Sequence, residues 1–213
     1  MLLIGFDLHA SPDAKTERWA KGVVLGPEFG GSGKTVSLWT KSPSISIMGE
    51  ASQQNVSIVE ECIKEINGAI HGTSISNIKL VEKDDSDADI LVYFTKLRDF
   101  PKVAKKHNFK YTKGNLGYFW TFWNASNEIT KAIVLISSDQ LEGKLLKHYT
   151  LEEITQSLGL SNDSNEFKDS IFYANPSNTT QLSKNDKLLL KFAYTHLKPG
   201  MNQREVEKAL KNF

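Results

Sequence analysis

The chain has 213 residues, of which 39% are hydrophobic and 24% are charged. This length fits one domain, and this composition supports a buried core and excludes an intrinsically disordered chain. The formal net charge of +1 argues against nucleic-acid binding as the main role, because that role normally requires a concentrated basic surface. We therefore expect a globular domain that has no nucleic-acid partner.

The cysteine content and the apolar runs exclude further kinds of structure. Cys62 is the only cysteine, so an internal disulfide and a multi-thiolate zinc site are both excluded. Its apolar neighbours Val59, Ile63 and Ile66 have helical spacing, which predicts a core position for the thiol. No apolar run is long enough for a membrane span, and residues 1–6 are too short and lack the basic residues of a signal peptide.

In chain order, the first element is irregular. A turn at residues 11–13 and a glycine-rich loop at 26–33 predict an irregular segment over residues 1–34, followed by a single domain over residues 35–213. Apolar spacing then predicts strands at 35–40, 44–48, 75–81, 90–95, 117–123 and 129–136, and helices at 55–70, 141–158, 184–196 and 204–211. Residues 124–127 predict a hairpin turn between the last two strands. The last two helices each have a predicted N-cap, Ser183 with Asp186 and Asn202 with Glu205. The helix at 141–158 is either continuous or restarts at Thr150. This order of elements predicts an α+β fold.

Residues 30–35 read Gly-Gly-Ser-Gly-Lys-Thr and partly match the phosphate-binding P-loop. The first glycine of that pattern would fall on Glu28, and a helix must follow the lysine so that its N-terminus faces the phosphates. Residues 36–40 alternate like a strand instead. We therefore expect Lys34 to bind no phosphate.

Residues 152–160 read Glu-Glu-Ile-Thr-Gln-Ser-Leu-Gly-Leu. This is the outline of the zinc-peptidase helix H-E-x-x-H with its histidines replaced: Glu152 and Gln156 occupy the ligand positions, and Glu153 occupies that of the catalytic general base. Gly159 occupies the glycine of the longer motif, where the chain turns toward a third ligand. The stretch resembles the scaffold of a metallopeptidase site more than its chemistry.

The third ligand position is Asn162, and Asp163 could replace it if the loop shifts by one residue. Catalytic zinc takes three ligands from imidazole, carboxylate and thiolate groups. The amides of Gln156 and Asn162 suit calcium or magnesium better. We expect no cofactor, with zinc or another divalent cation, held weakly by Glu152, Gln156, Asn162 or Asp163, as the alternative.

The carboxylates also have structural interpretations. Thr150 and Glu153 are spaced like a capping box, in which Glu153 would bond the N-terminal amide of a helix that restarts at Thr150. If the helix is continuous, His148 and Glu152 share one face and could chelate together.

Two segments downstream strengthen the resemblance to zinc peptidases. Residues 169–173 stand where metzincins carry their Met-turn, with Ser170, Ile171, Phe172 and Tyr173 matching it and Phe172 replacing the methionine. Residues 182–186, Leu-Ser-Lys-Asn-Asp, are similar to the start of the terminal helix of matrixins. The chain thus resembles an uncharacterised bacterial family of metzincin-like domains. The resemblance implies a metzincin-like (zincin-like) twisted mixed sheet with two long helices and a helical C-terminal tail, and it favours an extracytoplasmic or secreted location.

The densest aromatic cluster lies on the strand at 117–123. Because side chains alternate along a strand, Tyr118, Trp120 and Phe122 share one face and Phe119 lies on the other. One set is expected in the core. In a metzincin-like layout the strand before the helix borders the substrate cleft, so exposed Tyr118, Trp120 and Phe122 would bind peptide there.

These observations predict a divergent, inactive metallopeptidase-like domain that binds a peptide or protein along a cleft next to the helix at 152–160. The alternative is an active metal-dependent peptidase with Glu153 as general base. A structural module without a cleft is a third hypothesis. The oligomeric state is not indicated by any pattern.

Overall fold

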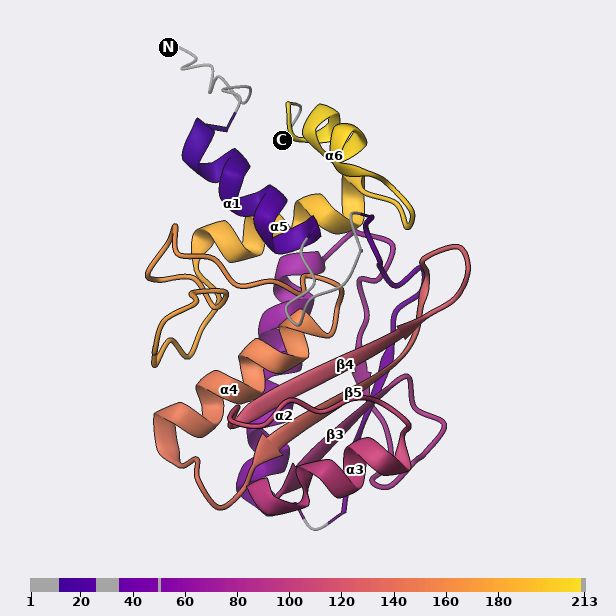
Figure 1. The fold of residues 1–213 in the computed structure, drawn as a ribbon, viewed down its shortest axis with the longest axis vertical. Coiled ribbons are helices and arrows are strands. Elements are labelled where there is room, and N and C mark those ends of the chain that lie inside the picture. Colours follow the sequence, from indigo (N-terminus) through magenta and orange to yellow (C-terminus); the bar gives the residue numbers. More distant parts are fainter. Residues whose placement is uncertain (1–11, 26–34, 50, 212–213) are drawn as a thin grey trace, which may run out of the picture.

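The computed structural model describes residues 12–25, 35–49 and 51–211 (Figure 1). The strands are β1 Ser44–Met48, β2 Lys79–Leu80, β3 Ile90–Thr95, β4 Gly117–Trp123 and β5 Ile129–Ser137. The helices are α1 Ala14–Leu25, α2 Gln53–Ile70, α3 Phe100–Lys106, α4 Gly143–Gln156, α5 Lys184–His196 and α6 Gln203–Leu210, with a 3-10 turn, η1 Leu97–Asp99, before α3.

The strands form one sheet in the order β2-β1-β3-β5-β4. β1, β2, β3 and β5 run parallel to one another, and β4 pairs antiparallel with β5 at the edge. The sheet therefore has a mixed topology, and the α+β class is confirmed. The long helices α2 and α4 lie on one side of the sheet and α3 lies on the other (Figure 1).

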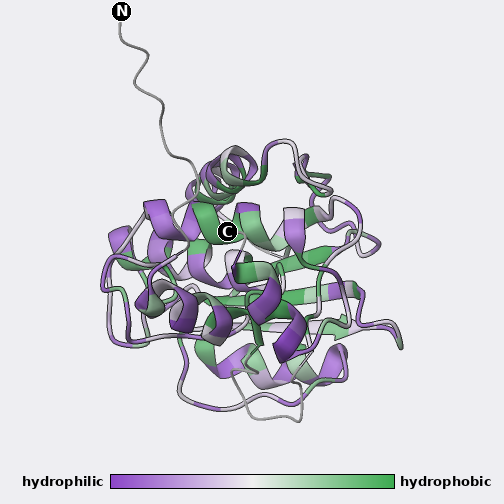
Figure 2. Ribbon diagram, turned by 90° about the horizontal axis from the view of Figure 1, so that it is seen from above, coloured by the Kyte–Doolittle hydropathy of each residue, from purple (hydrophilic) through white to green (hydrophobic). Residues whose placement is uncertain are grey.

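Two hydrophobic cores result from the alternation of side chains along the strands. Val92 and Val134 point into the larger core with α2, α4 and α5, while Leu91 and Leu135 point into the smaller core under α3. Parallel strands covered on both faces read as continuous apolar runs, as β3 and β5 do. The hydrophobic strands lie between helices whose outer turns are hydrophilic (Figure 2).

The predicted caps of the last two helices are confirmed. Ser183 and Asp186 form a capping box at the start of α5, and Asn202 and Glu205 form one at the start of α6. Each box satisfies two amides that the first helical turn leaves without carbonyl partners.

The irregular interpretation of residues 1–34 is wrong where α1 lies. The carboxylate of Asp13 accepts a hydrogen bond from the amide of Thr16 at 2.7 Å and so satisfies an amide of the first turn. Trp19 and Val23, one turn apart, are buried in the larger core, and α1 contacts α6. Residues 26–34, which include the glycine-rich loop and Lys34, lie outside the described residues.

Of two predicted strands, the one at 35–40 does not form and the one at 75–81 is shorter than predicted. The segment at 35–40 makes only isolated bridges, from Thr35 to Asn202 and from Leu38 to Glu128, and the segment at 75–81 forms only β2. The short helix α3 was not predicted, because its seven residues give too few turns for a periodic pattern.

Helix α4 runs without a break through Thr150, whose hydroxyl donates to the carbonyl oxygen of Leu146 at 2.7 Å. The capping box of Thr150 with Glu153 is therefore wrong, since Thr150 lies in the helix interior. No helix in the described part of the chain has the length and hydropathy needed to cross a membrane.

Candidate functional site

Helix α4 buries an unusual number of polar side chains. His148, Glu152 and Gln156 are 4%, 8% and 1% exposed, and Glu153 is 5% exposed. Because residues four apart lie on one helix face, His148, Glu152 and Gln156 form a continuous row, which we call the polar stripe of α4. Burial of such groups costs free energy unless they find partners.

The first partner of the stripe is a main-chain carbonyl. The Nδ1 atom of His148 lies 2.7 Å from the carbonyl oxygen of Thr179, and a carbonyl can only accept, so Nδ1 carries the proton. The Nε2 atom lies 3.5 Å from Oε2 of Glu152. Burial lowers the pKa of His148, which favours its neutral form. The continuous helix thus brings His148 and Glu152 together, as its spacing predicts.

The other end of the stripe meets the loop that follows α4. The Nε2 of Gln156 donates to Oδ1 of Asp163 at 2.8 Å. Burial raises the pKa of Asp163 to about 6, against the opposing effect of this hydrogen bond. The amide of Asn162 is directed elsewhere, since its Nδ2 donates to the carbonyl oxygen of Gly22 in α1 at 3.1 Å. Of the two residues expected near the third ligand position, Asp163 faces Gln156 and Asn162 bonds to α1.

This arrangement does not fit a catalytic zinc ion. Gln156 presents its amide nitrogen to Asp163, and an amide N–H is a donor rather than a ligand. Across residues 12–25, 35–49 and 51–211, no three His, Cys, Asp or Glu side chains cluster as a metal site. Zinc sites require three protein ligands of these types.

The Met-turn-like segment is bound to the start of α5 by a buried carboxylate. Asp186 accepts hydrogen bonds from the Ser170 hydroxyl at 2.6 Å and from the Ile171 amide at 3.0 Å. Burial raises the pKa of Asp186, although these bonds and those from Ser183 oppose the rise. The amide of Phe172 donates to the Ser170 hydroxyl at 3.0 Å.

The same turn reaches the loop after α4. The amide of Ser164 donates to the carbonyl oxygen of Phe172 at 2.8 Å, and Ser164 bridges to Tyr173. Since Ser164 follows Asp163, the turn and the end of the polar stripe are joined through this loop. Phe172 itself is fully buried and packs against Trp19.

Gly159 turns the chain at the end of α4. Its φ is +93°, and a Cβ at this position would lie 2.1 Å from the carbonyl oxygen of Ser37. Only glycine combines this conformation with so close an approach. The predicted turning role of Gly159 agrees with this geometry.

Glu153 lies beside the polar stripe and faces the edge strand. A Cβ on Gly117, the first residue of β4, would be 2.4 Å from Oε1 of Glu153 and 2.9 Å from Cδ1 of Tyr149. Burial, together with the charges of Glu152 and Glu153, raises the pKa of Tyr149. The absence of a side chain at Gly117 is what allows α4 and β4 to approach here.

Tyr118, Trp120 and Phe122 of β4 face away from α4, whereas Phe119 packs in the larger core on the α4 side. The ring of Phe109 stacks on Tyr118 and Trp120 with centroids 6.0 and 5.6 Å apart, and Phe122 packs against the same smaller core. Tyr118 is 1% exposed. Tyr118, Trp120 and Phe122, predicted to bind peptide in a cleft next to α4, therefore lie on the α3 side of the sheet. The strand directly before α4 is β5, which is interior, and the edge strand is β4.

The main chain of β4 has one side toward β5 and one side at the sheet edge. The amide of Ala132 donates to Asp89 and that of Ser137 donates to Leu116, so even-numbered residues of β5 bond toward β3 and odd-numbered ones toward β4. Thr121 is paired with Ala132, and its N–H and C=O therefore point to the outer edge. Exposure increases along β4, from buried Phe119 through half-buried Thr121 to Trp123, which is 55% exposed.

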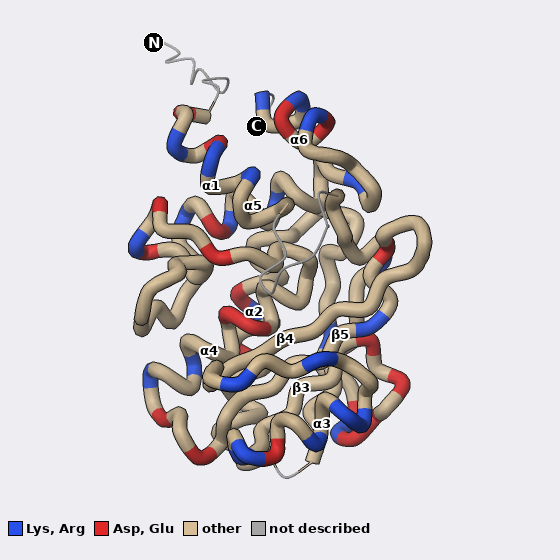
Figure 3. Tube along the Cα trace, viewed as in Figure 1, with Lys and Arg blue, Asp and Glu red and all other residues tan. Residues whose placement is uncertain are grey.

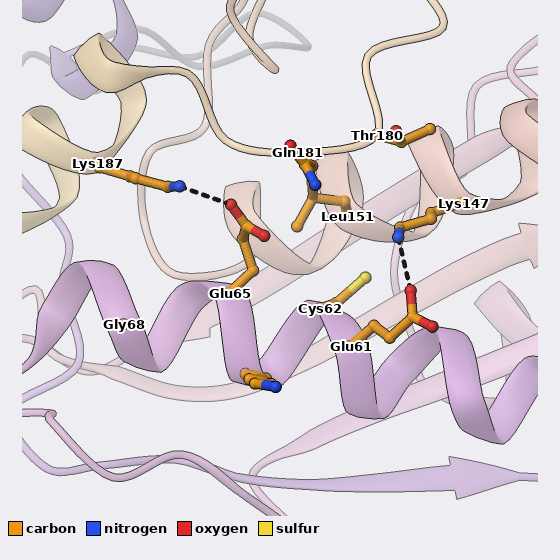
Figure 4. Close-up of a pocket in the computed structure, with 10 residues that line it drawn as sticks. Glu61, Cys62, Glu65, Gly68, Lys147, Leu151, Thr180, Gln181 and Lys187 are labelled. Atoms are coloured by element: carbon orange, nitrogen blue, oxygen red, sulfur yellow. Dashed lines mark hydrogen bonds and ion pairs between the residues drawn. The ribbon is translucent and has the colours of Figure 1, made fainter.

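A separate groove of about 510 Å³ lies between α2 and α4 (Figure 4). Its walls carry two ion pairs, Lys147–Glu61 at 2.6 Å and Lys187–Glu65 at 2.9 Å. Cys62, which faces this groove in Figure 4, is 1% exposed, and burial raises the pKa of its thiol to about 12. The predicted core position of Cys62 is confirmed.

Together these features define an α+β domain whose second long helix buries a polar stripe beside an antiparallel edge strand. The chain belongs to the DUF2927 family, described as a protein of unknown function, whose model matches residues 16–212. Membership of an uncharacterised family is thus confirmed.

Two solved structures of myroilysin are similar to this chain at 13% sequence identity and a TM-score of 0.45. The first match covers 76% of this chain and 97% of the myroilysin chain. The second covers 89% and 98%. No curated protein matches the sequence.

Proposed function

We propose that this domain binds an extended peptide or protein segment along the outer edge of β4, next to α4, and does not hydrolyse it. The observation that carries the proposal is the section of β4 around Thr121, which we call the open section because no other strand of the described residues pairs with its outer edge. Its main-chain groups point outward, and the neighbouring side chains of Trp120 and Phe122 are half-buried while Trp123 is exposed.

An open strand edge is a template for strand addition. A segment that pairs with it gains main-chain hydrogen bonds, and its alternate side chains contact the two faces of the sheet. Exposed and half-buried aromatic side chains add contact area at low entropic cost. The open section of β4 supplies both.

The absence of hydrolysis is proposed from the ligand chemistry of α4. Gln156 donates to Asp163, and Asn162 bonds to α1. Neither contact prepares an open tetrahedral zinc site with three charged or imidazole ligands. In this proposal the polar stripe has a structural role beside β4 and no catalytic role.

Peptide binding is tested by removing the outward amide of Thr121. Proline at an edge position deletes the outward N–H without deleting a bond to β5, so Thr121→Pro should weaken binding of a labelled extended peptide at least about 10-fold. The matched control is Thr121→Val, which keeps the amide and should bind within about two-fold. The probe is a peptide of about ten residues in which valine alternates with glutamine, followed by fluorescence anisotropy.

Circular dichroism and thermal melting must show that both variants fold. Equal binding by folded Thr121→Pro and wild-type protein would contradict strand addition at β4, as would the absence of any binding by wild-type protein.

The hydrolase alternative, with Glu153 as general base, has its own test. The protein, incubated with zinc and a fluorogenic peptide, should show no turnover that a chelator removes. A general base contributes about 100- to 10,000-fold, so chelator-sensitive turnover that falls by this factor in Glu153→Gln would establish the alternative.

A further inference from the structure

Positive charge is concentrated in one stretch of an otherwise balanced chain. Residues 96–113, which we call the basic segment, contain one acidic side chain, Asp99, and seven basic ones: Lys96, Arg98, Lys102, Lys105, Lys106, Lys110 and Lys113. The segment therefore carries +6, whereas the whole chain carries +1. Averaging over the whole sequence conceals this asymmetry.

The basic segment forms the outer layer on the α3 side of the sheet. It includes η1 and α3, and Lys and Arg residues gather around α3 and the stretch that follows it (Figure 3). All seven basic side chains are exposed. None of them forms an ion pair with a carboxylate in the described residues.

The end of the basic segment lies against β4. The ring of Phe109 stacks on Trp120 at 5.6 Å, and the hydroxyl of Tyr118 donates to the carbonyl oxygen of Lys110 at 2.9 Å. Lys110 is consequently anchored beside the edge strand. Lys113 follows three residues later in the stretch that leads into β4, and both side chains are exposed.

We infer that the basic segment selects an acidic peptide for the edge of β4. This inference rests on the proposed function: a segment paired with β4 extends the sheet, and its alternate side chains lie on the α3 side. Glutamate or aspartate at those positions would meet the field of Lys110 and Lys113. Complementary charge across such a contact increases specificity and the rate of association.

A nucleic acid would also be attracted by lysines, but it cannot pair with the main chain of a strand edge. The open amide of Thr121, adjacent to the aromatic contacts that hold Lys110, favours a polypeptide. Nucleic-acid binding is therefore an outcome that the experiment must separate.

The experiment compares three labelled peptides of the same length, in which valine alternates with glutamate, glutamine or lysine. Exposed charge contacts each change affinity by about 1.5- to 5-fold. The glutamate peptide should bind at least about 5-fold tighter than the glutamine peptide at low salt, and the lysine peptide should bind weakest. The difference should shrink to below about two-fold near 0.5 M salt, because screening removes the field.

Two double variants with equal loss of charge locate the effect. Lys110→Gln/Lys113→Gln should remove most of the preference for glutamate and leave affinity for the glutamine peptide within about two-fold. The control, Lys64→Gln/Lys208→Gln, removes two exposed lysines of α2 and α6 and should keep the full preference.

The outcomes separate the two proposals. Suppose that the peptides bind the wild-type protein, that Thr121→Pro removes this binding, and that glutamate is not preferred. The inference about charge is then wrong and strand addition stands. An equal effect of both double variants would also overturn the inference, since only net charge would matter. Tight binding of a labelled single-stranded RNA that Lys110→Gln/Lys113→Gln abolishes, with no peptide binding, would overturn both proposals.

Discussion

The two long helices of the larger core, α2 and α4, pack against each other and differ in what they bury. The buried positions of α2 are apolar with one exception, the capping residue Asn55. Of the nine buried residues of α4, only Leu146, Leu151 and Ile154 are apolar. Apolar burial stabilises a helix directly, whereas buried polar groups need a partner to avoid a net cost.

The polar side chains of α4 find partners within the helix itself and in the segments around it. Thr150 and Thr155 donate to carbonyls one turn earlier, His148 bonds to Thr179, and Gln156 bonds to Asp163. A helix that buries polar groups departs from what stability alone would select, and such departures concentrate at functional sites. This difference is the reason for proposing a functional site at α4 and the neighbouring β4 rather than at α2.

The largest expected effect on the free energy of unfolding comes from substituting the glycines that follow the two helices. Gly159 after α4 and Gly72 after α2 both have positive φ, but a Cβ on Gly159 would meet a main-chain oxygen at 2.1 Å and one on Gly72 only the flexible Nζ of Lys191 at 3.6 Å. Gly159→Ala should lower the free energy of unfolding by about 4 kcal/mol or more. Gly72→Ala, the control, should cost about 1 kcal/mol. Chemical denaturation measures both, and equal losses would show that the end of α4 is not constrained by its neighbour.

The next largest effect on stability is expected from the apolar core residues of α2. Ile66 of α2 is fully buried, so Ile66→Ala should lower the free energy of unfolding by about 2–5 kcal/mol through lost burial and a cavity. Lys64→Ala on the exposed face of the same helix should change it by no more than about 0.5 kcal/mol. A loss below about 1 kcal/mol for Ile66→Ala would mean that α2 is not the stabilising member of the pair.

A smaller effect on the free energy of unfolding is expected from Asp163, where the polar stripe of α4 ends. Here the wild-type residue lowers the stability at neutral pH instead of raising it. The pKa of Asp163 rises from its ordinary value of 3.8 to about 6 on folding, so the folded protein keeps a proton that the unfolded chain has already released. The free energy of unfolding should therefore fall as the pH rises from about 4 to about 6 and level off above, by roughly 1–3 kcal/mol from this residue. Stability curves at a series of pH values measure this slope.

Asp163→Asn keeps an acceptor for Gln156 and removes the charge. It should flatten that part of the pH profile and make the protein more stable at pH 7 than the wild type. A variant that is less stable at pH 7 would show that the ionised carboxylate stabilises the loop after α4.

The smallest effect on stability is expected at Thr150, and it shows whether this residue lies inside a helix or at its start. With α4 continuous, Thr150→Val removes only a hydroxyl bond to a carbonyl that already belongs to the helix, so the loss should be below about 1 kcal/mol. A double-mutant cycle with Glu153→Gln should give a coupling below about 0.5 kcal/mol. A coupling near 1 kcal/mol would indicate a capping interaction in solution and a break in α4.

Local sequence patterns determined much of the fold. The helical spacing of α2, the capping boxes of α5 and α6, and the apolar runs of β1, β3 and β5 were all predicted close to their observed bounds, because period and caps act within a few residues. The turn between β4 and β5 was predicted from its polar residues, and Asn127 there has a φ of 60°. The motif at residues 152–160 likewise indicated where the unusual helix lies.

Tertiary structure decided the rest, because those features depend on contacts between distant residues. The sequence predicts a strand at 117–123 but not that it is the edge strand, and so not which face its aromatic residues cover. Thr150 matches a capping box equally well in a helix interior or at a helix start, and packing against the sheet and α2 selected the interior. The partner of Gln156 and the raised pKa of Asp163 arise only when the loop after α4 folds back and is buried, since burial is a property of the assembled chain and not of its local pattern.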